Sequence, residues 1–155
     1  MSELVLRPAR PGEEDALSKL CLKSKAYWGY DAAFMTAVSP YLKITSEAIA
    51  AGLTTVAELD DGTLLGVCQI EPGSSKGSLD LLFVSPEAIG TGAGRALFED
   101  AKDKLRAAGD TVMTILSDPY AEPAYIHMGA RRVAMRPSDV FKGRELPWLE
   151  VDLQA

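Results

Sequence analysis

The sequence predicts an α/β or α+β fold in which helices pack on a mixed β-sheet. Two runs rich in β-branched residues flank Asp61-Gly62 and indicate a β-hairpin. The stretches "GSLDLLFVS" and "TVMTILS" are more continuously apolar, as in strands buried on both faces, and each precedes a helical pattern. A chain of 155 residues can bury its own core, so we expect a single domain over residues 1–155.

Composition excludes several classes of protein. The net charge of -6 argues against a general nucleic-acid-binding protein, which normally carries a basic patch. No apolar run reaches the ~18 residues of a membrane span, and "MSELVLRPARPGEED" lacks the regions of a secretory signal. Cys21 and Cys68 stand alone in apolar segments, which favours small buried side chains over a redox pair and gives no zinc site. We therefore expect a cytoplasmic protein without a metal.

The first third of the chain predicts one strand followed by helices. "ELVLRPA" alternates apolar and polar residues as a strand does. From Pro11 the period becomes helical, with acidic residues 13–15 in the first turn and Gly29 at the end. "DAAFMTAV" indicates a second short helix, and "TSEAIAAG" a third, with Thr45 as its N-cap and Gly52 as its stop.

The central segment predicts a hairpin, a buried strand and a long helix. Asp61-Gly62 is the dipeptide that favours a type I′ turn between the two hairpin strands. After "GSLDLLFVS" and a glycine-rich stretch, a helix continues to Gly109. Its helical spacing predicts a buried face made of Leu97, Ala101, Leu105 and Ala108.

The last segment predicts a strand, a helix and two closing strands. "TVMTILS" is the strand, and Asp118-Pro119 then resembles an N-cap followed by a first-turn proline, opening a helix to Met128. "ARRVAMRPS" and "ELPWLEVDL" follow as strands. The predicted order is thus one strand, a run of helices, three strands, and then a helix, a strand, a helix and two strands.

Gly90, Gly92 and Gly94 stand at alternate positions directly before the long helix. A dinucleotide fingerprint needs a small residue where this chain has Arg95 or Leu97, and a Walker loop needs a Lys-Ser/Thr pair after the glycines. The backbone amides of glycine residues at the start of a helix form a binding site for an anion, because their N–H groups and the positive end of the helix dipole point to the same place. The alternative is a turn that binds no ligand. A turn does not require three glycines, however, and each glycine loses backbone entropy on folding.

"VSPEAIGTGAGRAL" resembles the acetyl-CoA-binding segment of the GNAT superfamily of N-acetyltransferases. That segment reads Val-x-Pro, a spacer, then Arg/Gln-x-x-Gly-x-Gly/Ala at the start of a helix. Gly92 and Gly94 occupy the two small positions, whereas Ile89 replaces the Arg or Gln and cannot bond a phosphate. The resemblance implies a pyrophosphate site formed mainly by backbone amides, with the Thr91 hydroxyl as a supplement. Its residues are Ile89, Gly90, Thr91, Gly92, Ala93, Gly94 and Arg95.

"SDPYAEPAYIHMGA" resembles a second block of the same superfamily, Asn-x-x-Ala-x-x-x-Tyr-x-x-x-Gly-Phe. Ala121, Tyr125 and Gly129 match, while Asp118 replaces the Asn and Ala130 the aromatic residue. The resemblance covers most of the chain and implies that Asp118, Ala121 and Tyr125 also contact the cofactor. It implies the GNAT fold, a mixed sheet of six to seven strands with about four helices on its two faces. In that fold "LDLLFVS" and "TVMTILS" splay apart to form a cleft.

The resemblance also implies a mechanism, direct transfer of the acetyl group from acetyl-CoA to an amine without an acyl-enzyme. Backbone amides near Phe83 and Val84 are expected to bind the pantetheine arm and polarise the thioester carbonyl. Tyr125 holds the position of the acid that protonates the leaving thiolate. An aromatic residue on a short amphipathic helix is otherwise usually a core residue.

The base that takes a proton from the amine has two candidates. Asp80 and Glu71 lie on strands near the expected cleft, and either can act directly or through water, although both are common as solvated strand residues. His127 is two positions after Tyr125, about 200° around the helix, so we expect it to face elsewhere.

Acceptor binding in this superfamily commonly comes from the first two helices and their loop. Here Tyr27, Trp28 and Tyr30 offer aromatic faces and Asp31 a carboxylate to a cationic amine, although the rings can equally pack the helix on the sheet. We expect a primary amine on a small molecule as acceptor. A protein N-acetyltransferase and a non-catalytic acyl-CoA-binding sensor or subunit are the alternatives. The resemblance is compatible with a homodimer through the last strands.

Overall fold

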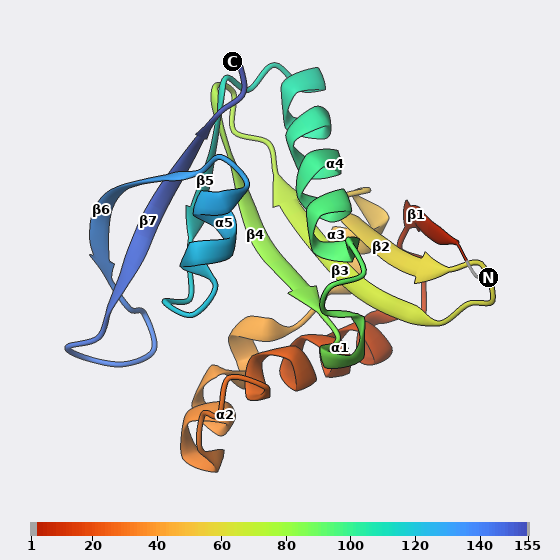
Figure 1. The fold of residues 1–155 in the computed structure, drawn as a ribbon, viewed down its shortest axis with the longest axis horizontal. Helices are drawn as coiled ribbons and strands as arrows, with labels where there is room; N and C mark the ends of the chain where they lie inside the picture. Colours follow the sequence, from red (N-terminus) through yellow and green to blue (C-terminus); the bar gives the residue numbers. More distant parts are fainter. Residues whose placement is uncertain (1–2, 155) are drawn as a thin grey trace. The chain divides into compact units, whose positions relative to one another are not determined.

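A computed structural model describes residues 3–154, whose elements are labelled in Figure 1. Among these residues seven strands form one sheet in the order β1-β2-β3-β4-β5-β7-β6. The strands are β1 (Leu4–Pro8), β2 (Thr54–Leu59), β3 (Leu64–Glu71), β4 (Lys76–Val84), β5 (Val112–Leu116), β6 (Arg131–Pro137) and β7 (Glu145–Asp152). The α-helices are α1 (Glu14–Ala26), α2 (Ala32–Val38), α3 (Ser46–Ala50), α4 (Ala93–Ala107) and α5 (Glu122–His127). Two 3-10 turns, η1 (Ser39–Leu42) and η2 (Pro86–Ala88), complete a mixed α/β fold, which confirms the predicted class.

The chain divides into two compact units, and each has its own buried residues. Unit 1 comprises residues 3–69 and 81–100, and unit 2 comprises residues 70–80 and 101–154. β3, β4 and α4 are each divided between the two units. None of the helices in residues 3–154 has the length and apolarity needed to cross a membrane.

In unit 1 the predicted β-hairpin is confirmed, but its type I′ turn is wrong. A type I′ turn needs positive φ at both central residues, whereas Gly62 alone has it, at 91°, and Asp61 does not. The Gly62 amide donates to the Leu59 carbonyl at 2.9 Å, and the Leu59 amide to the Thr63 carbonyl at 2.9 Å. These bonds close a three-residue loop, in which a turn is followed by one left-handed glycine.

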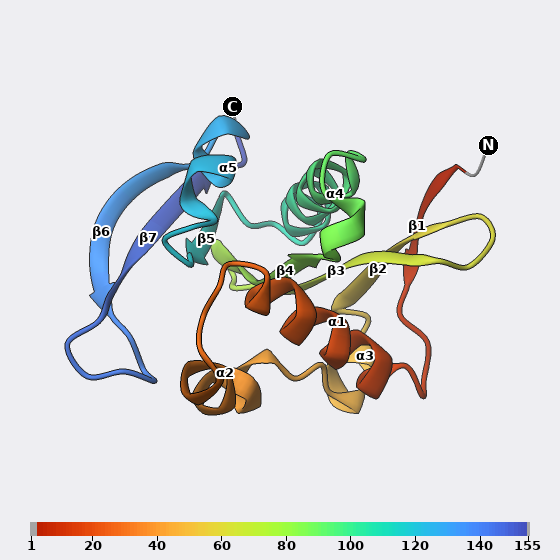
Figure 2. The same ribbon diagram turned by 60° about the horizontal axis from the view of Figure 1, so that its bottom comes forward.

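Helices cover both faces of this hairpin. Figure 2 shows α1 and α3 on one face of β2 and β3, and the start of α4 on the other. The buried side of α1 consists of Leu17, Leu20 and Cys21. On the opposite side Leu97 and Phe98 of α4 are both fully buried. Unit 1 therefore has a helix–sheet–helix interior.

An ion-pair cluster joins three elements of unit 1. The Arg7 guanidinium of β1 donates two hydrogen bonds to Glu13, which precedes α1, at 2.9 and 2.8 Å. Its Nε lies 2.9 Å from an oxygen of Glu58 on β2. The three side chains retain only 12%, 22% and 14% of their exposed area. The hydrogen bond from Arg7 holds the pKa of Glu13 below its usual range.

In unit 2, β7 pairs antiparallel with both β5 and β6, and Figure 1 shows it between them. β4 pairs parallel with β5 over Lys76–Ser78 and Val112–Thr114. This ladder ends there, although β5 continues to Leu116 and β4 to Asp80 within the same unit. The predicted splay of β4 and β5 requires that their pairing ends early, before either strand does. The interior of unit 2 includes Leu105, Met113, Ile115, Leu149 and Val151.

Three local predictions are wrong. Ala108 is exposed rather than buried, because α4 ends one residue before it. Residues 81–84 of β4 are half-buried and not enclosed on both faces. The helix predicted from Asp118 begins only at Glu122, because residues 119–121 form a turn and the proline of the first helical turn is Pro123.

Candidate functional site

The glycine-rich loop before α4 has the backbone that the sequence suggests. β4 ends at Val84, η2 follows, and Gly90 and Gly92 then adopt φ values of +86° and +90°. No other atom lies within 4 Å of where a Cβ would be at either glycine. Glycine is therefore required at both positions by the left-handed backbone.

Gly94 differs from Gly90 and Gly92 in its backbone conformation and in its surroundings. It does not adopt positive φ, and a Cβ there would lie 3.4 Å from Cγ2 of Val84. On the neighbouring strand, a Cβ at Gly66 would lie 2.9 Å from the carbonyl oxygen of Phe83. The strand β3 thus approaches the end of β4 closely, and the first turn of α4 lies at contact distance from it. This packing fixes the backbone of Phe83 and Val84, the predicted pantetheine contacts.

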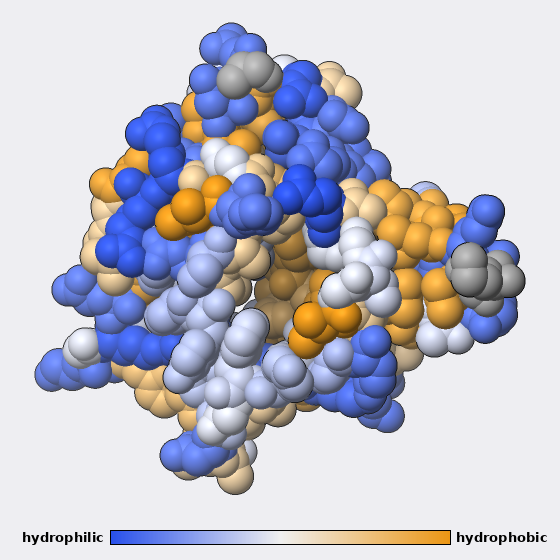
Figure 3. Space-filling view, viewed as in Figure 1, coloured by the Kyte–Doolittle hydropathy of each residue, from blue (hydrophilic) through white to orange (hydrophobic). Residues whose placement is uncertain are grey.

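The loop exposes backbone where an anion can reach it. Gly90, Thr91 and Gly92 are exposed, and α4 begins with first-turn amides that have no acceptor within the helix. The surface over the start of α4 is near white in Figure 3, between hydrophilic and hydrophobic. The Thr91 hydroxyl donates to the Ala88 carbonyl at 2.5 Å, so its proton is already used within the loop. The Thr91 amide also donates to the Ala88 carbonyl, at 3.1 Å, and the Ala93 amide donates to Oγ1 of Thr91 at 3.4 Å. The other backbone amides of the loop and of the first turn are therefore the candidate donors to an anion.

Charged and apolar side chains flank this loop. Ile89, where the superfamily has Arg or Gln, is 55% exposed. Arg95 is exposed in the first turn of α4. Lys23 of α1 forms an ion pair with Glu87 of η2 at 2.5 Å, and this hydrogen bond lowers the pKa of Glu87. The sequence interpretation missed this pair, because 64 residues separate its partners.

Tyr125 lies on the buried side of α5. It is 8% exposed, whereas His127 on the same helix is exposed. The expectation that His127 faces away from Tyr125 is thus confirmed. The carbonyl of Tyr125 accepts hydrogen bonds from the amides of Met128 and Ala130, which closes the helix.

The two other predicted residues of this motif shape the turn before α5. The Asp118 carboxylate accepts a hydrogen bond from the Tyr120 amide at 2.7 Å, and its carbonyl accepts one from the Ala121 amide at 3.0 Å. Ala121 itself is the N-cap of α5 and provides no side-chain bond. Both residues therefore position the start of the helix.

The two candidate bases are neighbours in unit 2. Asp80 and Glu71 are both exposed, at the ends of the β4 and β3 segments in this unit. The Ser78 hydroxyl donates to Oδ1 of Asp80 at 2.6 Å. Partial desolvation raises the pKa of Asp80, the hydrogen bond from Ser78 opposes this, and the charge of Glu71 raises it further. Asp80 is therefore a stronger base than an isolated aspartate.

The predicted acceptor residues gather at the junction of α1 and α2. Tyr27 and Trp28 are 58% and 41% exposed. Their rings pack edge to face, with 5.8 Å between the ring centres. Tyr30 stacks on Phe34 at 3.9 Å. Exposed aromatic side chains of this size are available to a ligand.

Tyr30 and Asp31 make further contacts within the chain. The Lys25 ammonium lies 5.3 Å from the centre of the Tyr30 ring. The Asp31 carboxylate caps α2 by accepting a hydrogen bond from the Phe34 amide at 2.8 Å. The cap had a sequence signal, since an aspartate directly before a helical run is a common N-cap.

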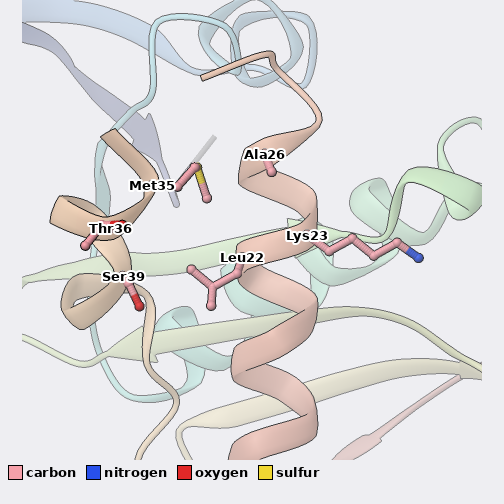
Figure 4. Close-up of a pocket in the computed structure, with 6 residues that line it drawn as sticks. All are labelled: Leu22, Lys23, Ala26, Met35, Thr36 and Ser39. Carbon is pink, nitrogen blue, oxygen red and sulfur yellow. The ribbon is translucent and has the colours of Figure 1, made fainter. Parts of the chain in front are cut away.

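A groove of about 440 Å³ lies between α1 and α2. Figure 4 shows Leu22 pointing from α1 towards α2, while the Lys23 ammonium points away from the groove. The residues that line the groove are Leu22, Lys23, Ala26, Met35, Thr36 and Ser39. The groove is therefore mainly apolar, with two hydroxyl groups.

Both cysteines lie in the interior of the described residues. Cys21 and Cys68 are buried, as predicted, and neither belongs to a disulfide; burial raises the pKa of the Cys21 thiol to about 12. A buried thiol of this kind is not an activated nucleophile. Across residues 3–154, no group of three histidine, cysteine, aspartate or glutamate side chains is placed to hold a metal ion.

The predicted residues fall in both units. The glycine-rich loop, Phe83, Val84 and the aromatic residues 27–30 belong to unit 1, while Tyr125 and the candidate bases belong to unit 2. Within their units, the structure brings Asp80 together with Glu71 and gathers the aromatic residues.

Solved structures share this fold at low sequence identity. A GCN5-related N-acetyltransferase from Rhodopseudomonas palustris, also described as "Aminotransferase, Class-II", is 19% identical, with a TM-score of 0.78 over 98% of this chain and 97% of that one. The PaiA N-acetyltransferase from Thermoplasma acidophilum, in complex with coenzyme A, is 14% identical, with a TM-score of 0.78 over 97% and 99%. YncA from Salmonella typhimurium, a putative acetyltransferase with its cofactor acetyl-CoA, is 19% identical, with a TM-score of 0.69 over 98% and 95%.

No curated protein sequence matches the chain. The model of the acetyltransferase (GNAT) domain, in contrast, matches residues 14–145, most of the chain. This match includes both motifs and all the predicted site residues. The chain therefore belongs to the GNAT family of N-acetyltransferases.

Proposed function

We propose that this enzyme transfers the acetyl group of acetyl-CoA directly to a primary amine on a small molecule. The observation that carries the proposal is the loop in which Gly90 and Gly92 adopt positive φ before the 15-residue helix α4. Membership of the family supports it, as do the complexes of the Thermoplasma protein with coenzyme A and of the Salmonella protein with acetyl-CoA.

The donor fits the chemistry of the loop. Its pyrophosphate is an anion, and exposed amides at a helix start bind anions through their N–H groups and the helix dipole. Between Gly90 and Arg95, the amides other than those of Thr91 and Ala93 would hold it, and amides near Phe83 and Val84 would bind the pantetheine arm. Acetyl-CoA supplies an activated acyl group as a thioester. The amides near Phe83 would stabilise the negative charge that develops on the carbonyl oxygen.

Tyr125 is the proposed acid. Its hydroxyl would give a proton to the thiolate that leaves, and its burial on α5 fixes the ring. The proposal needs no cysteine nucleophile, in keeping with the buried thiols.

Asp80 is the proposed base, with Glu71 as the alternative. Asp80→Asn should lower kcat by about 100-fold or more, since a general base contributes about 10²- to 10⁴-fold. Ser78→Ala removes the bond that stabilises the charged carboxylate, so the acid limb of kcat/KM should shift to higher pH. Glu71→Gln removes a negative neighbour and should shift that limb to lower pH. Rates measured between about pH 4.5 and pH 8 test this. Opposite or absent shifts contradict the role of Asp80, and loss of activity in Glu71→Gln alone would identify Glu71 as the base.

The proposed acceptor site uses the exposed rings of Tyr27 and Trp28. Tyr30 and Asp31 belong to the same cluster, but a cationic amine there would compete with Lys25 and with the α2 cap. We expect the amine to bind mainly through cation–π contacts with the two exposed rings.

One experiment tests the function against its alternatives. The enzyme is incubated with acetyl-CoA and a panel of small primary amines, amino acids and short peptides, and free thiol is followed. Thiol release with small amines supports the proposal, while release only with peptides indicates a protein acetyltransferase. Binding of acetyl-CoA without release across the panel indicates a sensor or subunit. Failure to bind acetyl-CoA contradicts all three.

Ile89→Arg should tighten the binding of coenzyme A by about three- to tenfold, because a charge-assisted bond to a phosphate replaces an exposed apolar side chain. Isothermal titration of CoA measures the change in Kd. Ile89→Glu is the matched control at the same exposed position and should weaken binding. Pantetheine, which has no pyrophosphate, should bind all three proteins equally. An unchanged Kd for CoA in Ile89→Arg would mean that the amides suffice.

A further inference from the structure

The helix that carries Tyr125 cannot hold its own orientation. α5 has only six residues, and its N-cap, Ala121, makes no side-chain hydrogen bond. Isolated helices of this length are unstable in water, since few backbone bonds offset the cost of ordering them. The direction of the Tyr125 ring must therefore be set by contacts between α5 and the rest of unit 2.

A two-bond ion pair provides such a contact. Glu122, in the first turn of α5, is 8% exposed. Its two carboxylate oxygens accept hydrogen bonds from Nε and Nη2 of Arg132 at 2.6 and 2.5 Å. Arg132 lies on β6, where it pairs with Leu149 of β7. These hydrogen bonds hold the pKa of Glu122 below its usual range, so the carboxyl stays ionised at neutral pH.

The geometry of this pair restrains rotation of the helix. Two parallel bonds between a guanidinium and a carboxylate fix both distance and orientation, which one bond to an ammonium does not. Glu122 and Tyr125 are three residues apart, so they lie about 60° from each other around the helix. Both are buried on that side. Rotation of α5 would thus displace the tyrosine hydroxyl, and a misplacement of about 1 Å can slow an enzyme by about 100-fold.

We propose that Arg132 is a positioning residue for the acid, since its paired bonds to Glu122 hold α5 in the rotation that directs the Tyr125 hydroxyl. This inference rests on the proposed role of Tyr125.

Arg132→Met should lower kcat about tenfold and change the KM for acetyl-CoA less than about threefold. Arg132→Lys keeps the charge without the two-bond geometry and should recover only part of kcat. Arg131→Met is the matched control, because Arg131 is the neighbour on β6 and pairs with Glu150 at 3.5 Å. It should leave kcat unchanged. Circular dichroism and thermal unfolding verify the fold, and Glu122→Gln replaces Arg132→Met if the latter does not fold.

A double-mutant cycle separates positioning from general destabilisation. If Arg132 acts through Tyr125, Arg132→Met slows the wild type but hardly changes kcat in a Tyr125→Phe background. An equal slowing in both backgrounds, or no slowing in the wild type, overturns the inference. Full kcat in Tyr125→Phe alone overturns the acid role first, and the inference with it. The two failures are therefore distinguishable.

Discussion

Replacing Tyr125 with phenylalanine should lower kcat by about 10- to 100-fold and leave the KM for acetyl-CoA nearly unchanged. General acids contribute about 10²- to 10⁴-fold, and the loss here should lie at or below the lower end of that range because a thiol of pKa about 8.5 leaves fairly well without help. The ring stays in place, since the substitution removes only the hydroxyl of a side chain that is 8% exposed. Steady-state thiol release with an accepted amine measures both constants.

A second tyrosine provides the control for this substitution. Tyr120 lies in the turn before α5 and is 55% exposed, so Tyr120→Phe removes a hydroxyl close by in the sequence and should leave kcat unchanged. A thioester with a more acidic thiol should reduce the loss in Tyr125→Phe, because its leaving group needs less protonation. Full kcat in Tyr125→Phe with every accepted amine contradicts the acid role.

Arg7→Met should destabilise the protein by about 3 kcal/mol at neutral pH. It leaves the carboxylates of Glu13 and Glu58 without their cation, and removal of one partner from a mostly buried ion pair costs about 3–5 kcal/mol. The lower end applies because the side chains keep 12–22% of their exposed area. Urea unfolding followed by circular dichroism measures the change in free energy.

The effect of Arg7→Met should decrease in acid. Arg7 lowers the pKa of Glu13 in the folded protein, so this pair contributes stability that is present above the unfolded pKa of about 4.3. That contribution is lost as the pH falls through the lower folded pKa. The triple variant Arg7→Met, Glu13→Gln and Glu58→Gln removes all three charges and should recover much of the stability. A penalty independent of pH, or a triple variant as unstable as Arg7→Met, contradicts the ionic origin.

Much of the fold could be predicted because it depends on local patterns. Apolar patterns and helix-end signals identified the strands and all five α-helices, and Thr45 was correctly predicted as the N-cap of α3. The type of the hairpin turn was not predicted correctly, because Asp61-Gly62 fits both a two-residue and a three-residue loop. The register of the two strands decides between these loops. The late start of α5 depends likewise on a turn that the Asp118 carboxylate stabilises.

The candidate site was less accessible to prediction where it depends on contacts distant in the sequence. The loop of Gly90 and Gly92 could be identified by its motif, but the packing of Gly94 on Val84 needs the position of β4. The contact of Lys25 with Tyr30 depends on how the chain turns after α1. The pairing of Glu122 with Arg132 depends on the packing of α5 against β6.

The open space around Gly90 and Gly92 has a consequence for the chirality of the loop. Nothing lies within 4 Å of a Cβ at either position, so the obstacle to a side chain there is its handedness and not its size. An L-alanine would pay about 1–2 kcal/mol for positive φ. A D-alanine prefers that region, and introduced by chemical synthesis it would stiffen the loop without strain. The loop thus requires the left-handed backbone conformation at these two positions, and glycine is the one genetically encoded residue that adopts it freely.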